Sequence, residues 1–221
     1  MICLHRRAAV WMVMGLSLAG MCASAAEPQI LAPGYKALNY PAPVPGTYEL
    51  PVLWSAADGG VLDERGQLTR LHALMGDKAV VMSFIYTHCN DVNGCPLATF
   101  VLSQLQGPVA ADPRLKDKVR LVTLSFDPQR DTPPVIAAYG EKFREAEFDW
   151  SFLTGESTTD LAPVLADYDQ STQLVTGGDG VISHVLRVYL IDTDKQVRNV
   201  YNTSFLHADS VISDLRTILA E

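Results

Sequence analysis

Apolar and polar segments alternate along the chain in a way that predicts an alternation of strands and helices. The longest apolar segment runs from Ala79 to Tyr86, a pattern typical of a strand buried on both faces of a sheet. A second apolar segment, Val119 to Phe126, predicts another strand. Further strands are expected at 50–56, 150–153, 185–192 and 197–202, with the last two joined as a hairpin by the polar turn at 193–195.

Helical spacing of apolar residues appears between these strands. Apolar side chains from Leu97 to Leu105 share one stripe, which predicts a helix over 96–106 that Gly107 and Pro108 would end. A second helix is expected over 132–143, with Thr132 as its N-cap and Pro133 at its first position. Helices are also expected at 157–168 and 207–219, and a short helical or irregular piece is expected at 68–75.

The order of these elements predicts an α/β fold in which parallel strands come first and an antiparallel pair comes last. We therefore expect a central mixed sheet flanked by helices. Turn residues at 58–60 and 64–66 predict a short N-terminal hairpin before the main sheet. The segment 26–47 is rich in Pro and Gly without a sustained period, so we interpret it as a linker or a surface arm before a domain at 48–221.

The first 25 residues have the layout of an export signal. A basic start at Arg6 and Arg7 precedes an apolar run from Ala8 to Ala19 and small residues up to Ala25. Cleavage after Ala25 is the preferred interpretation, with lipid attachment at Cys22 or an uncleaved anchor as alternatives. An apolar run of about 12 residues is short for a membrane span, which needs roughly 20. The expected location is the periplasm, with a membrane-anchored form as the variant.

Charge changes this picture only slightly. The formal net charge is -8, and it becomes -10 if the segment with Arg6 and Arg7 is removed. An acidic surface disfavours nucleic acid and suits a cationic partner. Because the acidic residues are dispersed along the sequence, an ordinary solvated surface is the simpler interpretation.

The chemistry lies in the pair Cys89 and Cys95, which directly follows the predicted strand at 79–86. Reactive groups in α/β sheets gather beyond the carboxyl ends of the strands. Cys95 precedes Pro96, so we expect it at a helix N-cap, where the dipole would lower the thiol pKa. The alternative is an inert pair, either buried or joined in a surface disulfide, but the polar loop 90–94 argues against burial.

Three ordered motifs resemble the Sco/SenC family of thioredoxin-like copper chaperones for cytochrome oxidase assembly. The first, at 84–89, reads Phe-Ile-Tyr-Thr-His-Cys, and the second, at 125–133, reads Ser-Phe-Asp-Pro-Gln-Arg-Asp-Thr-Pro. The third combines Ser183 and His184 with the segment Val-Tyr-Leu-Ile-Asp at 188–192. The resemblance covers roughly residues 48–221 and implies a thioredoxin-like fold.

The resemblance also implies a copper ion, Cu(I) or Cu(II), held by Cys89, Cys95 and His184. Two thiolates and an imidazole form a soft donor set that suits copper. The implied partner is a copper-receiving respiratory enzyme such as cytochrome c oxidase, or another copper carrier. The rival hypothesis is a periplasmic thiol:disulfide oxidoreductase in which Cys89 and Cys95 act without metal.

Two departures from the family pattern bear on that site. Family members carry C-x3-C, whereas five residues separate Cys89 from Cys95 here. We expect Asn93 and Gly94 to absorb the longer loop with positive φ so that the thiols still meet. Ser183 stands where the family usually has Asp, which removes a carboxylate that would orient His184.

Other polar residues near these motifs are interpreted as structural. His88 should point away from Cys89, because adjacent strand residues face opposite sides. Asp91 is either a turn former or a negative charge beside the metal. The segment with Asp127, Arg130 and Asp131 predicts a loop and cap with an ion pair. His72 and His207 lack a partner pattern, and His207 is expected at the surface.

Overall fold

The computed structural model describes residues 32, 35, 38–170, 173–174 and 182–221. The predicted export signal and most of the Pro-rich segment lie outside this part of the chain. The strands are β1 (Trp54–Ser55), β2 (Gly60–Leu62), β3 (Leu68–Arg70), β4 (Ala79–Ile85), β5 (Val119–Ser125), β6 (Trp150–Leu153), β7 (Gln173–Leu174), β8 (Ile182–Ser183), β9 (Val188–Ile191) and β10 (Gln196–Tyr201). The helices are α1 (Leu71–Met75), α2 (Cys95–Ala111), α3 (Pro133–Gly140), α4 (Thr158–Asp167) and α5 (Ala208–Ile218).

The main sheet has six strands in the order β1-β10-β9-β4-β5-β6. β4 pairs parallel with β5, and β5 pairs parallel with β6, whereas β9 joins the other side of β4 antiparallel. β10 returns antiparallel to β9, which confirms the predicted hairpin. The predicted α/β class with a central mixed sheet is therefore confirmed, and the separate β2–β3 pair forms the N-terminal hairpin. The piece predicted at 68–75 is divided, because Leu68–Arg70 pairs with β2 as a strand and only Leu71–Met75 is helical.

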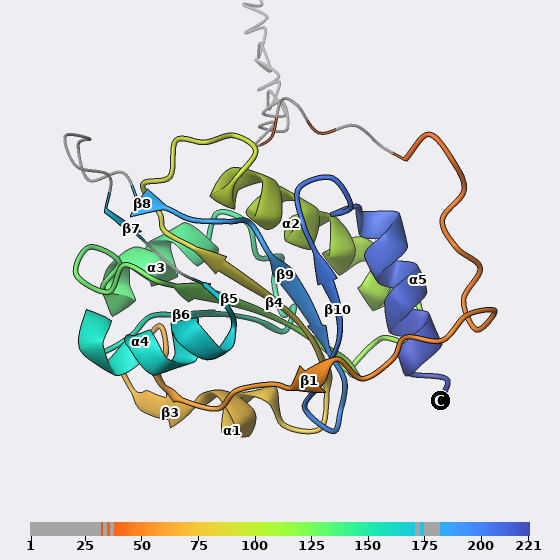
Figure 1. The fold of residues 1–221 in the computed structure, drawn as a ribbon, viewed down its shortest axis with the longest axis horizontal. Coiled ribbons are helices and arrows are strands. Elements are labelled where there is room, and N and C mark those ends of the chain that lie inside the picture. Colours follow the sequence, from red (N-terminus) through yellow and green to blue (C-terminus); the bar gives the residue numbers. More distant parts are fainter. Residues whose placement is uncertain (1–31, 33–34, 36–37, 171–172, 175–181) are drawn as a thin grey trace, which may run out of the picture.

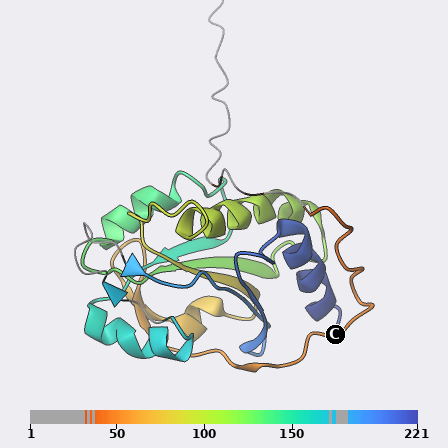
Figure 2. The same ribbon diagram turned by 45° about the horizontal axis from the view of Figure 1, so that its top comes forward.

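β4 lies in the centre of the sheet because its residues are almost all apolar and favour burial. Each of its seven residues is buried, as expected for a strand covered by helices on both faces. Figures 1 and 2 show α2, α3 and α5 on one face of the sheet and α1 with α4 on the other. The hydroxyls of Thr99 and Tyr139 bond at 2.8 Å and join α2 to α3.

The helix predicted over 96–106 was expected to end at Gly107 and Pro108. This end is wrong, because α2 continues to Ala111. An internal proline costs a helix about 3 kcal/mol, since it removes one hydrogen bond and crowds the preceding turn. The extra turn buries Val109, which is 2% exposed and extends the apolar stripe of the helix. Tertiary burial thus outweighs the local preference to stop.

The part of the N-terminal arm that the structure describes lies against the domain. The ring of Tyr35 packs on Phe100 with centroids 4.9 Å apart. Farther along, the amide of Gly46 donates to Thr217 Oγ1 at 3.1 Å, and the Tyr48 hydroxyl donates to Asp214 at 2.6 Å. Figure 1 shows this orange segment passing along α5 before it enters β1.

Candidate metal centre

The two cysteines lie where β4 leaves the sheet and α2 begins. Cys89 is in the loop after β4 and is partly exposed, whereas Cys95 is buried, and both are free thiols. Cys95 was predicted as the N-cap of the helix, but the N-cap is Gly94 and Cys95 is the first helical residue. The expectation that the polar loop would keep both thiols out of the core is also wrong for Cys95, which is 2% exposed.

The longer loop closes through a turn built on Asp91. Its carboxylate accepts from the Asn93 amide at 3.0 Å, and its carbonyl accepts from the Gly94 amide at 2.9 Å. Asp91 is therefore a turn former, one of its two predicted roles. Neither Asn93 nor Gly94 has positive φ, contrary to expectation. The five-residue loop brings the thiols together without a positive φ; Gly94 instead has φ -99° and ψ -121°, outside the helical and extended regions.

His184 completes a group of three side chains that could hold a metal ion. It follows β8, and its Nε2 lies 3.3 Å from the Cys95 sulfur. The donor atoms of Cys89, Cys95 and His184 all lie within 4.8 Å of one another. The structure thus brings together residues that are far apart in the sequence, and it places them at the end of β4.

The orientation of the His184 ring is fixed by the backbone. Its Nδ1 lies 3.2 Å from the carbonyl of Ile182. A carbonyl only accepts, so Nδ1 carries the hydrogen and the lone pair of Nε2 faces the thiols. A backbone carbonyl commonly orients a metal-binding imidazole in this way. Ile182 therefore performs the orienting role that the family's Asp, replaced here by Ser183, was expected to fill.

The two thiols have opposite pKa shifts. The pKa of Cys89 is lowered to about 5, chiefly by a hydrogen bond from the Cys95 thiol, with backbone donors and the nearby His184 adding to the effect. The pKa of Cys95 is raised, first by burial and then by the Cys89 thiolate. The prediction that the helix start would lower the pKa of Cys95 is wrong, because burial outweighs the dipole there. Cys89 is the nucleophilic thiolate.

Aromatic side chains enclose one side of the group. The ring of Phe126 lies 5.0 Å from that of His184, and Tyr86 lies 5.7 Å from it, edge-on. The backbone amide of Tyr86 also donates to the Cys95 sulfur at 3.4 Å. The pKa of Tyr86 is raised to about 12, by burial first and by Cys89 second. These rings lower the local polarity and restrict access of water to the buried thiol.

A buried carboxylate holds the end of β4 in place. Asp131 is fully buried and accepts hydrogen bonds from the Thr87 amide at 2.9 Å, from the Thr87 hydroxyl, and from the Ser125 hydroxyl at 2.5 Å. The predicted ion pair in this segment exists, with Arg130 Nε lying 3.5 Å from Asp127. The motif was predicted to be structural, but its link to the segment before Cys89 was not foreseen.

The other histidines that the structure describes lie outside the group. The side chain of His88 is 63% exposed, contacts the Thr87 hydroxyl at 3.0 Å and lies 3.9 Å from Asp131. The prediction for His88 assumed a strand, but residues 87–88 form a turn. His72 bonds the carbonyl of Ala56 at 2.8 Å. His207 was expected at the surface, but it is half-buried and its ring packs against Tyr35 at 5.7 Å.

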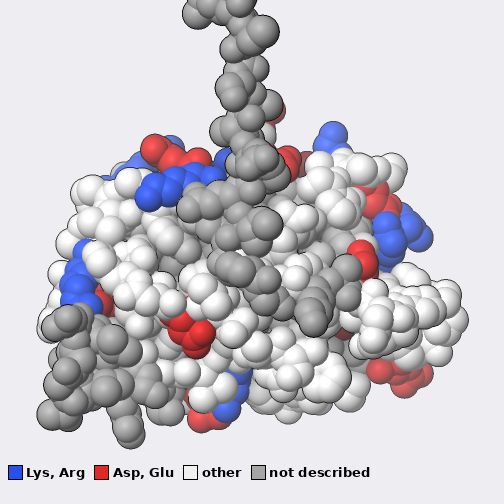
Figure 3. All heavy atoms as spheres, turned by 90° about the horizontal axis from the view of Figure 1, so that it is seen from above, with Lys and Arg blue, Asp and Glu red and all other residues white. Residues whose placement is uncertain are grey.

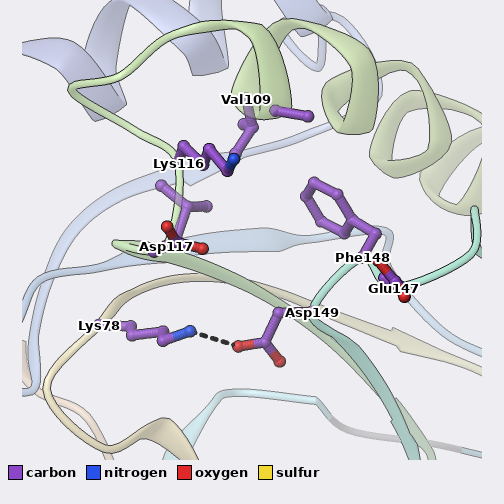
Figure 4. Close-up of a pocket in the computed structure, with 9 residues that line it drawn as sticks. Lys78, Val109, Lys116, Asp117, Glu147, Phe148 and Asp149 are labelled. Atoms are coloured by element: carbon purple, nitrogen blue, oxygen red, sulfur yellow. Dashed lines mark hydrogen bonds and ion pairs between the residues drawn. The ribbon is translucent and has the colours of Figure 1, made fainter.

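A small pocket at the opposite end of β4 offers different chemistry. It has a volume of about 110 Å³ and lies beside Lys78 and Asp149. Figure 4 shows the Lys78 ammonium directed at the Asp149 carboxylate, 2.7 Å away. Arg120 also pairs with Asp149, at 2.8 Å. Asp149 is therefore paired within the protein, whereas Asp117 and Glu147, which also line the pocket, are exposed.

The face at the top of the view in Figure 1 carries mixed charges. Figure 3 shows Lys and Arg side chains lying beside Asp and Glu in small separate groups, with uncharged surface between them. No single-sign surface dominates the visible part of this face. The dispersed charge that the sequence predicted is consistent with this view.

Comparison with known proteins decides the family. The SCO1/SenC family model matches residues 60–220. The chain belongs to the SCO1/SenC family. The match includes both cysteines and His184, so the candidate metal centre lies inside the part of the chain that the family shares.

Individual relatives agree with this assignment. The SCO1 protein homolog of Bacillus subtilis (strain 168) is 27% identical over 157 residues, covering 70% of this chain and 78% of that protein. Among solved structures, a SCO1/SenC family lipoprotein from Bacillus anthracis str. Ames is 28% identical with a TM-score of 0.65, covering 76% of this chain and 96% of the other. Bradyrhizobium japonicum ScoI with copper bound is 25% identical with a TM-score of 0.60, covering 74% and 99%. The predicted thioredoxin-like fold is confirmed by these neighbours.

In the described part of the chain, no helix is both long enough and apolar enough to cross a membrane.

Proposed function

We propose that this SCO1/SenC protein binds one copper ion through Cys89, Cys95 and His184. The observation that carries the proposal is the convergence of two sulfurs and one imidazole nitrogen within 4.8 Å. Thiolate and imidazole donors favour copper over hard cations such as magnesium or calcium. The copper-bound Bradyrhizobium japonicum ScoI supports the choice of metal.

The chemistry of the three side chains suits a metal that is bound and then passed on. Cys89 is ionised at neutral pH and partly exposed, so it offers a ready first ligand. Cys95 holds its proton until a metal or base displaces it, so binding would release a proton from this thiol. Three protein ligands leave a coordination position open for an incoming ligand of an acceptor protein.

The biological role follows from the family. We infer that the protein is exported and delivers copper to a respiratory copper enzyme such as cytochrome c oxidase, or keeps the thiols of that enzyme ready for metal. The basic, apolar and small-residue pattern of residues 1–25 supports export. The name of the Bacillus anthracis relative, a lipoprotein, is consistent with this location.

A second function, thiol:disulfide exchange without metal, is favoured by one observation. The pKa of Cys89 is lowered while that of its neighbour Cys95 is raised. A partly exposed, low-pKa thiolate beside a protonated thiol is the arrangement that redox-active cysteine pairs use. In this function His184 would influence the thiols without holding a metal.

The test is an anaerobic copper titration of the reduced protein, following bound metal and sulfur-to-copper absorption. Cys89→Ser, Cys95→Ser and His184→Ala are compared with the wild type. His88→Ala is the matched control, because this neighbouring histidine is exposed and lies outside the group.

The proposal expects about one tightly held copper in the wild type and in His88→Ala, with affinity falling at least tenfold in each of the other three variants. Equal affinity in His184→Ala would remove His184 from the site. Absence of tight copper in the wild type, together with a readily reduced disulfide between the cysteines, would instead establish the exchange function.

A further inference from the structure

A second pocket lies between the N-terminal arm, β10 and α5. Its volume is about 400 Å³, within the range of ligand-binding pockets. The lining residues are Tyr40, Pro43, Tyr48, Leu50, Asn199, Val200, Tyr201, Phe205, Ser210 and Asp214. None of them belongs to the candidate metal centre, which is built from the end of β4, the start of α2 and the end of β8. Figure 1 shows α5 and the arm on the other side of the domain from β8.

The pocket contains one carboxylate, that of Asp214, a residue that is 6% exposed. One carboxylate oxygen accepts from the Tyr48 hydroxyl at 2.6 Å. The other oxygen accepts from the Tyr201 hydroxyl at 2.5 Å and from the Asn199 amide at 2.9 Å. A carboxylate has about four acceptor positions, so the oxygen bonded to Tyr48 retains one for a further donor.

The three donors to Asp214 are neutral, and no described Lys, Arg or His forms an ion pair with it. The arginine of β10, Arg198, pairs with Asp192 and Glu221. The arginine of α5, Arg216, pairs with Asp112. The arginines of β10 and α5 are thus paired with other carboxylates. An opposite charge offsets the cost of burying a carboxylate, so Asp214, whose described donors are all neutral, favours a cationic ligand.

The walls of the pocket suit the same ligand. Three tyrosines and Phe205 line it, and aromatic rings attract ammonium and guanidinium groups. The pKa of Tyr48 is raised to about 12 by burial and by Asp214, and the pKa of Tyr201 is raised by the same two causes. Both hydroxyls therefore keep their protons and remain hydrogen-bond donors to Asp214.

Two exposed aromatic residues at the rim of the pocket favour a cation that belongs to a polypeptide over a free small amine. Tyr40 and Phe205 line the pocket and are 54% and 63% exposed. A free small amine would leave both rings in water, whereas a polypeptide that carries the basic side chain would cover them. The net charge of -8 also favours association with a basic partner.

We propose that this pocket is a docking site for a basic side chain, arginine or lysine, of a partner protein. The cationic head enters beside the free acceptor position of Asp214, the apolar stem lies among the tyrosines, and the partner's backbone covers Tyr40 and Phe205. Arginine is the preferred side chain, because its planar guanidinium both donates several hydrogen bonds and stacks on aromatic rings.

The test is an NMR titration of the isotope-labelled full-length protein with a matched pair of probes. Capped arginine carries the cation, and capped citrulline has the same shape without the charge. A third probe is the capped peptide Leu-Arg-Leu, which adds backbone and apolar neighbours. Asp214→Asn removes the charge of the pocket. Phe205→Ala changes only an exposed rim residue, so it still tests binding of the peptide if Asp214→Asn does not fold.

The proposal expects saturable shifts at Tyr48, Tyr201 and Asn199 with capped arginine, and none with citrulline. The peptide should bind about tenfold more tightly than capped arginine, and Asp214→Asn should abolish the response to both. Phe205→Ala should weaken the peptide several-fold while leaving capped arginine unchanged.

Three results would overturn the proposal. The first is an absence of saturable shifts with any probe, and the second is an equal response to arginine and citrulline. The third is equal affinity for capped arginine and the peptide, which would assign the pocket to a free small amine.

Discussion

Asp131 offers a direct test of how the fold holds the end of β4. Its carboxylate accepts three hydrogen bonds, two from the amide and hydroxyl of Thr87 and one from the Ser125 hydroxyl. Thr87 lies two residues before Cys89, so these bonds fix the segment that carries the exposed thiol. Asp131→Ala removes all three acceptors, and Asp131→Asn retains the shape while removing the charge.

The expected magnitudes differ between the two variants. A hydrogen bond to a charged group contributes about 1.5–3 kcal/mol, and a buried donor left without an acceptor costs about 1–3 kcal/mol. Relief from burying the charge offsets part of this loss, so we expect Asp131→Ala to lower the free energy of unfolding by about 3–5 kcal/mol.

The matched variant should lose much less. In Asp131→Asn the amide oxygen can accept from the Thr87 amide and from Ser125. The amide nitrogen can then donate to the Thr87 hydroxyl, which turns toward His88 Nδ1, 3.0 Å away. We therefore expect a loss of about 1 kcal/mol, the difference between charged and neutral hydrogen bonds.

Urea unfolding of the reduced, metal-free protein measures both losses through the shift of the midpoint at constant slope. If the free energy of unfolding of Asp131→Ala is within about 1 kcal/mol of the wild-type value, the three hydrogen bonds do not hold the strand end and the reasoning fails. Equal losses in the two variants would mean that charge, rather than geometry, dominates.

Three further results are expected. Gly140→Ala would place a Cβ 2.5 Å from the Phe152 ring and should lower the free energy of unfolding by about 1–3 kcal/mol in thermal melting, whereas Gly107→Ala meets nothing within 4 Å and should not destabilise. In a pH titration of the reduced, metal-free protein, thiolate absorption from Cys89 should decrease as pH falls through about 5. The stabilisation by this thiolate is present above the ordinary cysteine pKa and should be lost as pH falls through the lowered pKa. A midpoint near the ordinary cysteine value would contradict the proposed hydrogen bonding. Deleting two residues from the loop 90–94 should shift the reduction potential of the cysteine pair by tens of millivolts, where about 30 mV corresponds to about 1.4 kcal/mol, and an unchanged potential would show that the insertion is neutral.

Much of the architecture could be predicted from the sequence because secondary structure depends on local periodicity. The continuous apolar run at 79–86 identified the central strand, and the order of elements predicted the mixed sheet. The loop with Cys89 and Cys95 was placed correctly at a strand end, since residues that follow a strand emerge at the edge of the sheet. The three motifs also indicated the family before any geometry was known.

Only the tertiary structure decided properties that depend on contacts between distant residues. The continuation of α2 past Pro108 depends on what Val109 packs against, and no local pattern records that contact. The opposite pKa shifts of Cys89 and Cys95 depend on burial and on their hydrogen bond, which spacing alone does not reveal.

The surroundings of two carboxylates depend on the fold in the same way. In sequence, Asp131 is a residue before a helix cap, and Asp214 is a polar residue within a helix. Folding surrounds Asp131 with donors from β5 and the end of β4, and it places Asp214 in an aromatic pocket. The sequence by itself thus determined the elements and the reactive residue types, because these depend on neighbours along the chain. The chemical environment of each site was decided by tertiary packing, because burial and pairing join residues that the sequence keeps far apart.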